Sequence, residues 1–222
     1  NRKKIYSHDE VTFFHSSGMS KRKGTETLIS SYISGKLYKK SRLIIHSQIS
    51  SDNFTNLSIN ELEGYNINFI CKTVPVPGLY HLGDVYVYPT KLEGLGLTIF
   101  EALASGLPVI VPNNPPMNEV VTEDIGKLIN YTHLYSRQDG YYWPQVSIDE
   151  KHLIDLMEYY INNPSSIKKE GLLAKKIINS EYNFWNMKNK INDIIDKSKT
   201  YHLSKASFNE FKKCIIFTYI CS

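Results

Sequence analysis

Short apolar runs alternate with amphipathic stretches along most of this sequence, and this alternation restricts the fold more than any other feature. Buried strands are expected at residues 11–15, 43–45, 67–70, 84–88, 109–111 and 127–129. Helices are expected between them at residues 25–38, 97–104 and 116–122. The pattern predicts an α/β fold that is Rossmann-like, with a parallel sheet and helices on both faces.

The pattern changes after the sixth expected strand. Residues 131–147 are polar and aromatic and are expected to form a loop, and helices are expected at 149–162, 164–180 and 184–199. The sequence therefore predicts a Rossmann-like domain at residues 1–147 and C-terminal helices at 148–200 that pack on or beside it. Residues 201–222 form a tail to which no structure is assigned.

Composition excludes several classes of protein. The net charge of +4 suits an anionic small ligand and makes no case for nucleic acid. The three cysteines, Cys71, Cys214 and Cys221, have no metal-ligand spacing and form no even disulfide framework, which predicts a reduced, cytoplasmic compartment. No apolar run approaches the ~20 residues of a membrane-spanning helix. Because the chain starts at Asn1, we expect either a fragment or a split-gene product.

One segment carries most of the chemistry: Glu93-Gly94-Leu95-Gly96-Leu97-Thr98-Ile99-Phe100-Glu101. It follows an expected strand and opens a helix, where parallel sheets bind their ligands. Gly94 and Gly96 allow close approach of a ligand, and the first helical amides suit a phosphate. The carboxylate of Glu101 can accept hydrogen bonds from a ribose diol. On spacing alone, a glycine-rich turn with two solvated glutamates is an equally good interpretation.

This segment resembles the Glu-x7-Glu signature of the family 4, or group 1, retaining glycosyltransferases. The flanking runs at residues 84–89 and 101–110 resemble the family too, and the resemblance extends over roughly residues 11–129. It implies the C-terminal, donor-binding half of a GT-B enzyme, in which residues 1–147 bind a nucleotide-sugar. It further implies that Glu93 contacts the donor sugar and Glu101 the ribose. The resemblance places the diphosphate at Gly94, Leu95, Gly96, Leu97 and Thr98.

A basic cluster, Gly18-Met19-Ser20-Lys21-Arg22-Lys23-Gly24, is similar to a second motif of the family. That motif has a Gly, an Arg and then a Lys-Gly pair, whose cations neutralise the leaving diphosphate. Lys23 and the glycine after it match the pair. Met19 stands where the family has Arg and the loop is one residue shorter, which leaves Lys21 and Arg22 as candidate substitutes. A solvated basic turn would be the preferred interpretation if the cluster stood alone.

The resemblance implies a hexosyltransferase that moves a sugar from a nucleoside-diphosphate sugar to a sugar or glycan acceptor with retained configuration. Glu93 would orient the sugar and Lys23 would stabilise the leaving group. Neither a cofactor nor a metal is implied, and the sequence has no Asp-x-Asp that would hold one. An N-terminal acceptor domain, in the same or another chain, is expected to complete the enzyme. The alternative is a non-catalytic sugar-nucleotide-binding or scaffold domain descended from such an enzyme.

Weaker candidates lie elsewhere. Cys71-Lys72-Thr73 occupies the position where the family's backbone meets the nucleobase, although a plain loop is equally plausible. His15, His46 and His81 are expected to be packed or at the surface rather than to act as bases. Tyr141-Tyr142-Trp143 has rings that could stack on a sugar, but we expect it to pack on its own domain. The nucleobase, the sugar and the acceptor are not identified by the sequence.

Overall fold

The computed structural model describes residues 10–137, 140 and 142–198. The chain divides into two compact units, Asn1–Asn179 and Ser180–Ser222. The first unit holds the sheet and its covering helices. The second holds α7 (Phe184–Ser198). The tail at residues 201–222 lies outside the described residues.

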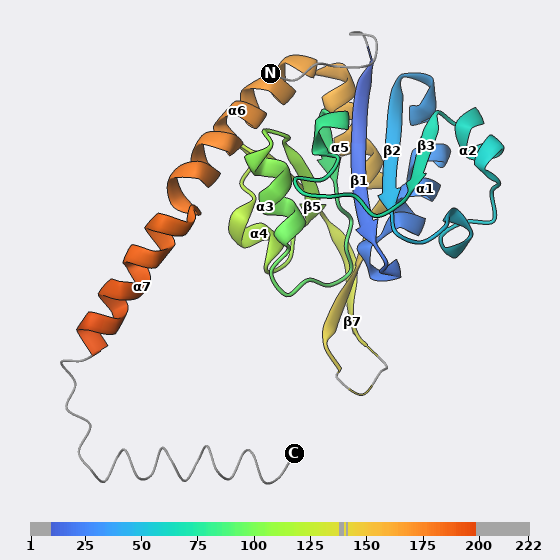
Figure 1. Cartoon of the computed structure of the whole chain (residues 1–222). Coiled ribbons are helices and arrows are strands. Elements are labelled where there is room, and N and C mark those ends of the chain that lie inside the picture. The colour runs from blue at the N-terminus through green and yellow to red at the C-terminus, as the bar shows by residue number, and fades with distance from the viewer. Residues whose placement is uncertain (1–9, 138–139, 141, 199–222) are drawn as a thin grey trace. The chain divides into compact units, whose positions relative to one another are not determined.

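Six parallel strands form the sheet of the first unit, in the order β3-β2-β1-β4-β5-β6 (Figure 1). The strands are β1 (Val11–Gly18), β2 (Ser41–Ser47), β3 (Ile67–Cys71), β4 (Val85–Val87), β5 (Val109–Pro112) and β6 (Gly126–Ile129). The chain builds outward from β1 to β3, then returns to place β4 on the other side of β1. This reversal creates a topological switch point between β1 and β4, where open α/β sheets bind their ligands. The predicted Rossmann-like sheet is therefore confirmed.

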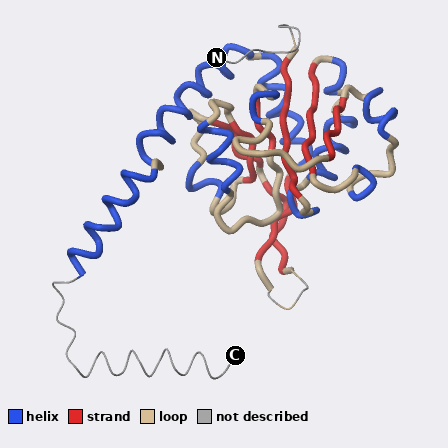
Figure 2. The backbone as a smooth tube through the Cα atoms, in the orientation of Figure 1, coloured by secondary structure: helices blue, strands red, loops and turns tan. Residues whose placement is uncertain are grey.

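Helices cover both faces of the sheet (Figure 2). The α-helices of the first unit are α1 (Thr25–Ser34), α2 (Ile59–Gly64), α3 (Leu97–Ala104), α4 (Met117–Val120), α5 (Glu150–Asn162) and α6 (Pro164–Glu181), which ends just past the boundary of the unit. The 3-10 helices are η1 (Lys21–Lys23), η2 (Leu37–Lys39), η3 (Ser51–Asn53) and η4 (Tyr80–Leu82).

Alternate residues of each strand enter two separate cores, which explains why the strands are apolar throughout. Phe13 and Val85 face the core that contains residues of α1, α2 and α5. Phe14 and Tyr86 face the core that contains residues of α3, α4 and α6. A parallel sheet buried on both faces requires apolar side chains at odd and even positions alike.

A polar network and a close backbone contact fix α6 on its core. The ammonium of Lys127 lies 2.8 Å from a carboxylate oxygen of Glu170, and the hydroxyl of Tyr160 donates to the other oxygen at 2.5 Å. Nearby, a Cβ placed on Gly171 would lie 2.2 Å from the carbonyl oxygen of Gly106. Only a glycine lets the backbone of α6 approach the turn after α3 this closely.

The structure differs from the predicted elements at three places. Residues 131–147 were expected to form a loop, but β7 (Tyr131–Ser136) and β8 (Pro144–Ile148) pair there as an antiparallel hairpin. The expected helix at 25–38 ends at Ser34, because Lys36 adopts the left-handed conformation with φ 54°. The sequence analysis missed α2, which Ser58 starts through a reciprocal capping box with Glu61.

Candidate functional site

Two loops meet at the switch point and position the basic cluster beside the Glu93 segment. The amide of Lys91 donates to the carbonyl of Arg22 at 2.8 Å. A Cβ on Gly24, whose φ is 78°, would lie 2.0 Å from the carbonyl oxygen of Pro89. The loop after β4 therefore packs directly against the turn at residues 21–24, and a glycine is required at the contact.

Glu93 lies at the centre of the junction between these two loops. Its side chain is 7% exposed, and its Oε1 forms an ion pair with the ammonium of Lys23. The same oxygen accepts hydrogen bonds from the hydroxyls of Tyr88 at 2.7 Å and Thr90 at 2.9 Å. Within the described residues all three interactions go to Oε1, so Oε2 remains for a ligand. Lys23 also lies 5.3 Å from the ring centroid of Tyr88, a cation–π distance that further fixes the ammonium.

The glycine-rich turn leaves the start of α3 open to an anion. Gly96 occupies the N-cap position with φ 71°, and no side chain caps the helix there. The first amides of α3 therefore lack side-chain partners, as a phosphate site requires. A Cβ on Gly94 would meet nothing within 4 Å, so the backbone at this position is open to a ligand. The side chains of Leu95 and Leu97 are apolar and have no donor, so only the backbone amides of these residues can bind a phosphate.

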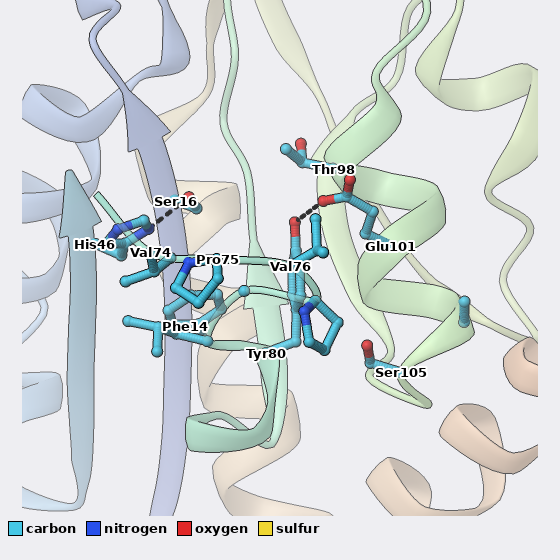
Figure 3. Close-up of a pocket in the computed structure, with 14 residues that line it drawn as sticks. Phe14, Ser16, His46, Val74, Pro75, Val76, Tyr80, Thr98, Glu101 and Ser105 are labelled. Atoms are coloured by element: carbon cyan, nitrogen blue, oxygen red, sulfur yellow. Dashed lines mark hydrogen bonds between the residues drawn. The ribbon is translucent and has the colours of Figure 1, made fainter. Parts of the chain in front are cut away.

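A pocket of about 530 Å³ adjoins the start of α3 (Figure 3). Thr98 and Glu101 form its α3 side, and the segment after β3 forms the opposite wall. The hydroxyl of Tyr80 donates to Oε2 of Glu101 at 2.6 Å and orients the carboxylate. Burial, followed by the neighbouring Tyr86 and the bond to Glu101, raises the pKa of Tyr80, so this hydroxyl keeps its proton. The wall consists of residues 74–80 rather than Cys71-Lys72-Thr73.

The other residues of the basic cluster have different surroundings. Lys21 lines a separate hollow of about 630 Å³ between α1 and residues 52–57. Arg22 is exposed and contributes its carbonyl to the contact with Thr90 and Lys91. Gly18, with φ 57°, ends β1. The structure thus brings Lys23 and Glu93 together, while the residue that replaces the family's Arg stays a prediction.

Tyr80, Tyr88 and Thr90 are parts of the site that the sequence analysis missed. Tyr88 and Thr90 flank Pro89, immediately before the Glu93 segment, so their position along the chain was a usable signal. Tyr80 lies in η4, and nothing in its local sequence indicates that it meets Glu101.

His15 is packed beneath the junction, as expected. Its Nδ1 lies 2.8 Å from the carbonyl oxygen of Val87, and its Nε2 lies 2.8 Å from the hydroxyl of Thr25. Because the carbonyl can only accept, Nδ1 carries the proton and Nε2 accepts from Thr25. Burial lowers the pKa of His15 to about 4, so the ring stays neutral at the core of the site.

This burial predicts a pH dependence of stability. The unfolded state takes up a proton near pH 6.5 and the folded state only near pH 4, so the free energy of unfolding falls as the pH drops through that window. The loss approaches about 3 kcal/mol at the acid end. Urea unfolding between pH 4 and 7 measures it. A His15→Gln variant with the same pH slope as the wild type would contradict this assignment.

The hairpin carries exposed aromatic side chains. Tyr142 is 73% exposed and Trp143 is 51% exposed. The sequence analysis expected these two rings to pack on the domain, and this expectation was wrong. Tyr141 lies outside the described residues. The middle of β8 is tied to the loop before Glu93, because the amide of Val146 donates to the carbonyl of Lys91 at 3.0 Å.

The described residues offer neither a cluster of metal ligands nor a helix suited to a membrane. No group of three or more His, Cys, Asp or Glu side chains there could hold a metal ion. No helix in that part of the chain is long and apolar enough to cross a membrane. The absence of a required metal or cofactor stays a prediction.

Comparison with known proteins decides the family. The family described as glycosyl transferases group 1 matches residues 1–170. The chain belongs to this family. An uncharacterised glycosyltransferase of Haemophilus influenzae is 29% identical over 122 residues, which are 54% of this chain and 30% of that protein. The lipopolysaccharide core biosynthesis mannosyltransferase LpsB of Rhizobium meliloti is 36% identical over 77 residues, 33% of this chain and 22% of that protein.

Solved structures of glycosyltransferases share the fold. A glycosyltransferase from Rickettsia africae superposes with a TM-score of 0.67 at 18% identity, over 88% of this chain and 49% of that one. The C-terminal domain of the group 1 family protein LpcC from Francisella tularensis superposes with a TM-score of 0.60 at 18% identity, over 78% of this chain and 87% of that domain. This glycosyltransferase chain spans less than a third of the curated relatives it matches.

Proposed function

We propose that this chain is the donor-binding half of a retaining hexosyltransferase that uses a nucleoside-diphosphate sugar. The observation that carries the proposal is the ion pair of Lys23 with Glu93 at the switch point of the sheet, in the loop that leads into the uncapped start of α3. A cation and free amides at one edge suit a diphosphate, and the adjoining pocket suits the nucleoside.

In the proposed mechanism each group has a separate task. The Lys23 ammonium and the amides of Leu97 and Thr98 would receive the diphosphate and stabilise the negative charge that grows as it leaves the sugar. Glu93, held through Oε1, would orient the sugar through Oε2. Glu101, held by Tyr80, would accept hydrogen bonds from the ribose. No step in this scheme requires the protein to attack the sugar.

The remaining parts of the proposal concern partners and place. A sugar or glycan is the proposed acceptor, and a companion N-terminal domain in the same or another chain would bind it. Orientation of acceptor and donor in a closed cleft can contribute ~7–11 kcal/mol to lowering the barrier, so this half alone should transfer poorly. The cytoplasm stays the predicted location. UDP is the first nucleotide to test, because TarM and Alr3699/HepE have structures in complex with it.

The experiment measures release of nucleoside diphosphate from UDP-, GDP- and ADP-sugars, with and without glycan acceptors. The chain alone is expected to bind one donor class without sustained turnover. Supplying the acceptor half should start transfer, and the anomeric configuration of the product, read by NMR, should match that of the donor. An inverted product would contradict retention, and absence of binding to every nucleotide would contradict the whole proposal.

Glu101→Ala is expected to weaken nucleotide binding because it removes charge-assisted hydrogen bonds to the ribose, each contributing ~1.5–3 kcal/mol. Tyr80→Phe is the matched variant, since it keeps the carboxylate and removes only the hydroxyl that orients it. Its effect on affinity should be smaller. Titration calorimetry with a nucleoside diphosphate and its 2′-deoxy form checks the assignment. If Glu101→Ala leaves the affinity unchanged, Glu101 does not bind the ribose.

A further inference from the structure

His46 joins the ends of three adjacent strands beneath the pocket. It lies near the end of β2, is 8% exposed and lines the pocket together with Ser16 (Figure 3). Its Nε2 lies 2.8 Å from the carbonyl oxygen of Lys72, the first residue after β3. Its Nδ1 lies 3.2 Å from the hydroxyl of Ser16 in β1.

The two contacts determine which ring nitrogen carries the proton. A carbonyl oxygen can only accept, so Nε2–H of His46 donates to Lys72. Nδ1 faces the hydroxyl of Ser16, which has a proton to donate to it. Ser16 of β1 therefore holds the ring of His46, and this ring in turn holds the segment that follows β3.

That segment, residues 72–80, leads into the pocket wall formed by residues 74–80, and its hydrogen bonds to the rest of the domain lie mainly at its two ends. At its start, the amide of Lys72 donates to the carbonyl of Ser47 at 3.0 Å, and the carbonyl of Lys72 accepts from His46. At its end, the hydroxyl of Tyr80 donates to Glu101. Between these points Pro75 and Pro77 have no amide proton to donate. The hydrogen bond from His46 is therefore one of few that set the position of the wall.

We propose that His46 is a positioning residue that determines affinity for the nucleoside part of the donor, by fixing the pocket wall through the carbonyl of Lys72. This inference rests on the proposed function, because it takes the pocket to be the nucleoside site. It predicts a loss confined to ligands that contain a nucleoside. Pyrophosphate would bind at Lys23 and the start of α3, so its affinity should not change when His46 is replaced.

Two substitutions of similar size separate positioning from general structural support. In His46→Gln the side-chain amide reaches about as far as Nε2 and can still donate to Lys72. In His46→Asn the amide ends about where Nδ1 lies and falls short. Calorimetric titration of the 222-residue chain with UDP, GDP, ADP and pyrophosphate measures the affinities of both variants and of the wild type. Thermal melting checks that each variant is folded.

For the nucleotide that the wild type binds best, His46→Asn is expected to weaken affinity about 10-fold and His46→Gln less than about 3-fold. Pyrophosphate affinity should stay within about 2-fold in both. Equal affinity of wild type and His46→Asn, equal losses in the two variants, or a parallel loss for pyrophosphate would each overturn the inference. If His46→Asn does not melt cooperatively, Ser16→Ala replaces it, with an expected loss of about 3-fold for the nucleotide alone. Unchanged nucleotide affinity in that variant would overturn the inference too. If the wild type binds no nucleotide, the proposed function itself is wrong.

Discussion

Replacing Lys23 with alanine is expected to slow sugar transfer about 100- to 1000-fold in the enzyme with both halves present, the loss that follows removal of one charge-stabilising group. The reason is the position of the ammonium. Glu93 and the ring of Tyr88 hold it at the loop that leads into the start of α3, so it is fixed in place before a diphosphate arrives. Loss of a preorganised cation raises the barrier more than it weakens binding of the ground state.

Binding to the chain itself provides a second measure of Lys23. Lys23→Ala should weaken binding of a nucleoside diphosphate and leave binding of the nucleoside nearly unchanged, because the ammonium meets phosphate rather than base or ribose. Lys151→Ala, an exposed lysine on α5, is the matched control and should change neither. Equal losses for nucleoside and nucleoside diphosphate would show that Lys23 does not contact the diphosphate.

Gly171→Ala is expected to destabilise the domain by about 2–3 kcal/mol, although alanine is the better helix former. The added Cβ would lie 2.2 Å from the carbonyl oxygen and 3.0 Å from the carbonyl carbon of Gly106. Both are backbone atoms, so α6 must move away from the turn after α3 and disturb the pairing of Lys127 with Glu170.

Gly64→Ala is the matched control for that variant. Gly64 also lies in a helix, but a Cβ there would meet nothing within 4 Å. It should leave stability unchanged or raise it by up to about 1 kcal/mol, because alanine loses less backbone entropy on folding. Urea unfolding measures both. If Gly171→Ala is as stable as Gly64→Ala, α6 does not pack against Gly106 as described.

Much of the site could be predicted from the sequence because its main parts lie on short, local motifs. Lys23 and Glu93 follow strands that end at the same edge of the sheet, so their meeting follows from topology once the parallel order is assigned. The same reasoning places Glu101 one turn into α3. The apolar pattern indicates the strands and the helix, and the resemblance to the group 1 family implied the roles of these residues.

Contacts made by the irregular loop after β3 and by α6 could not be predicted in the same way. The bond between Tyr80 and Glu101 and the bond between His46 and Lys72 depend on how a loop without regular structure returns to the sheet. The hairpin at β7 and β8 was missed because β7 is exposed along most of its length and has no apolar alternation to indicate a strand. Gly171 looked like an ordinary helical glycine, and only the approach of Gly106 gives it a role.

A crystal structure of this chain with the nucleoside diphosphate it binds best would test the central claim most directly. We predict the diphosphate against the amides of Leu97 and Thr98 and within hydrogen-bonding distance of the Lys23 ammonium. The ribose should lie at Glu101 and the base in the pocket beside residues 74–80. A nucleotide bound elsewhere on the chain, or with its phosphates away from Lys23 and α3, would contradict the account.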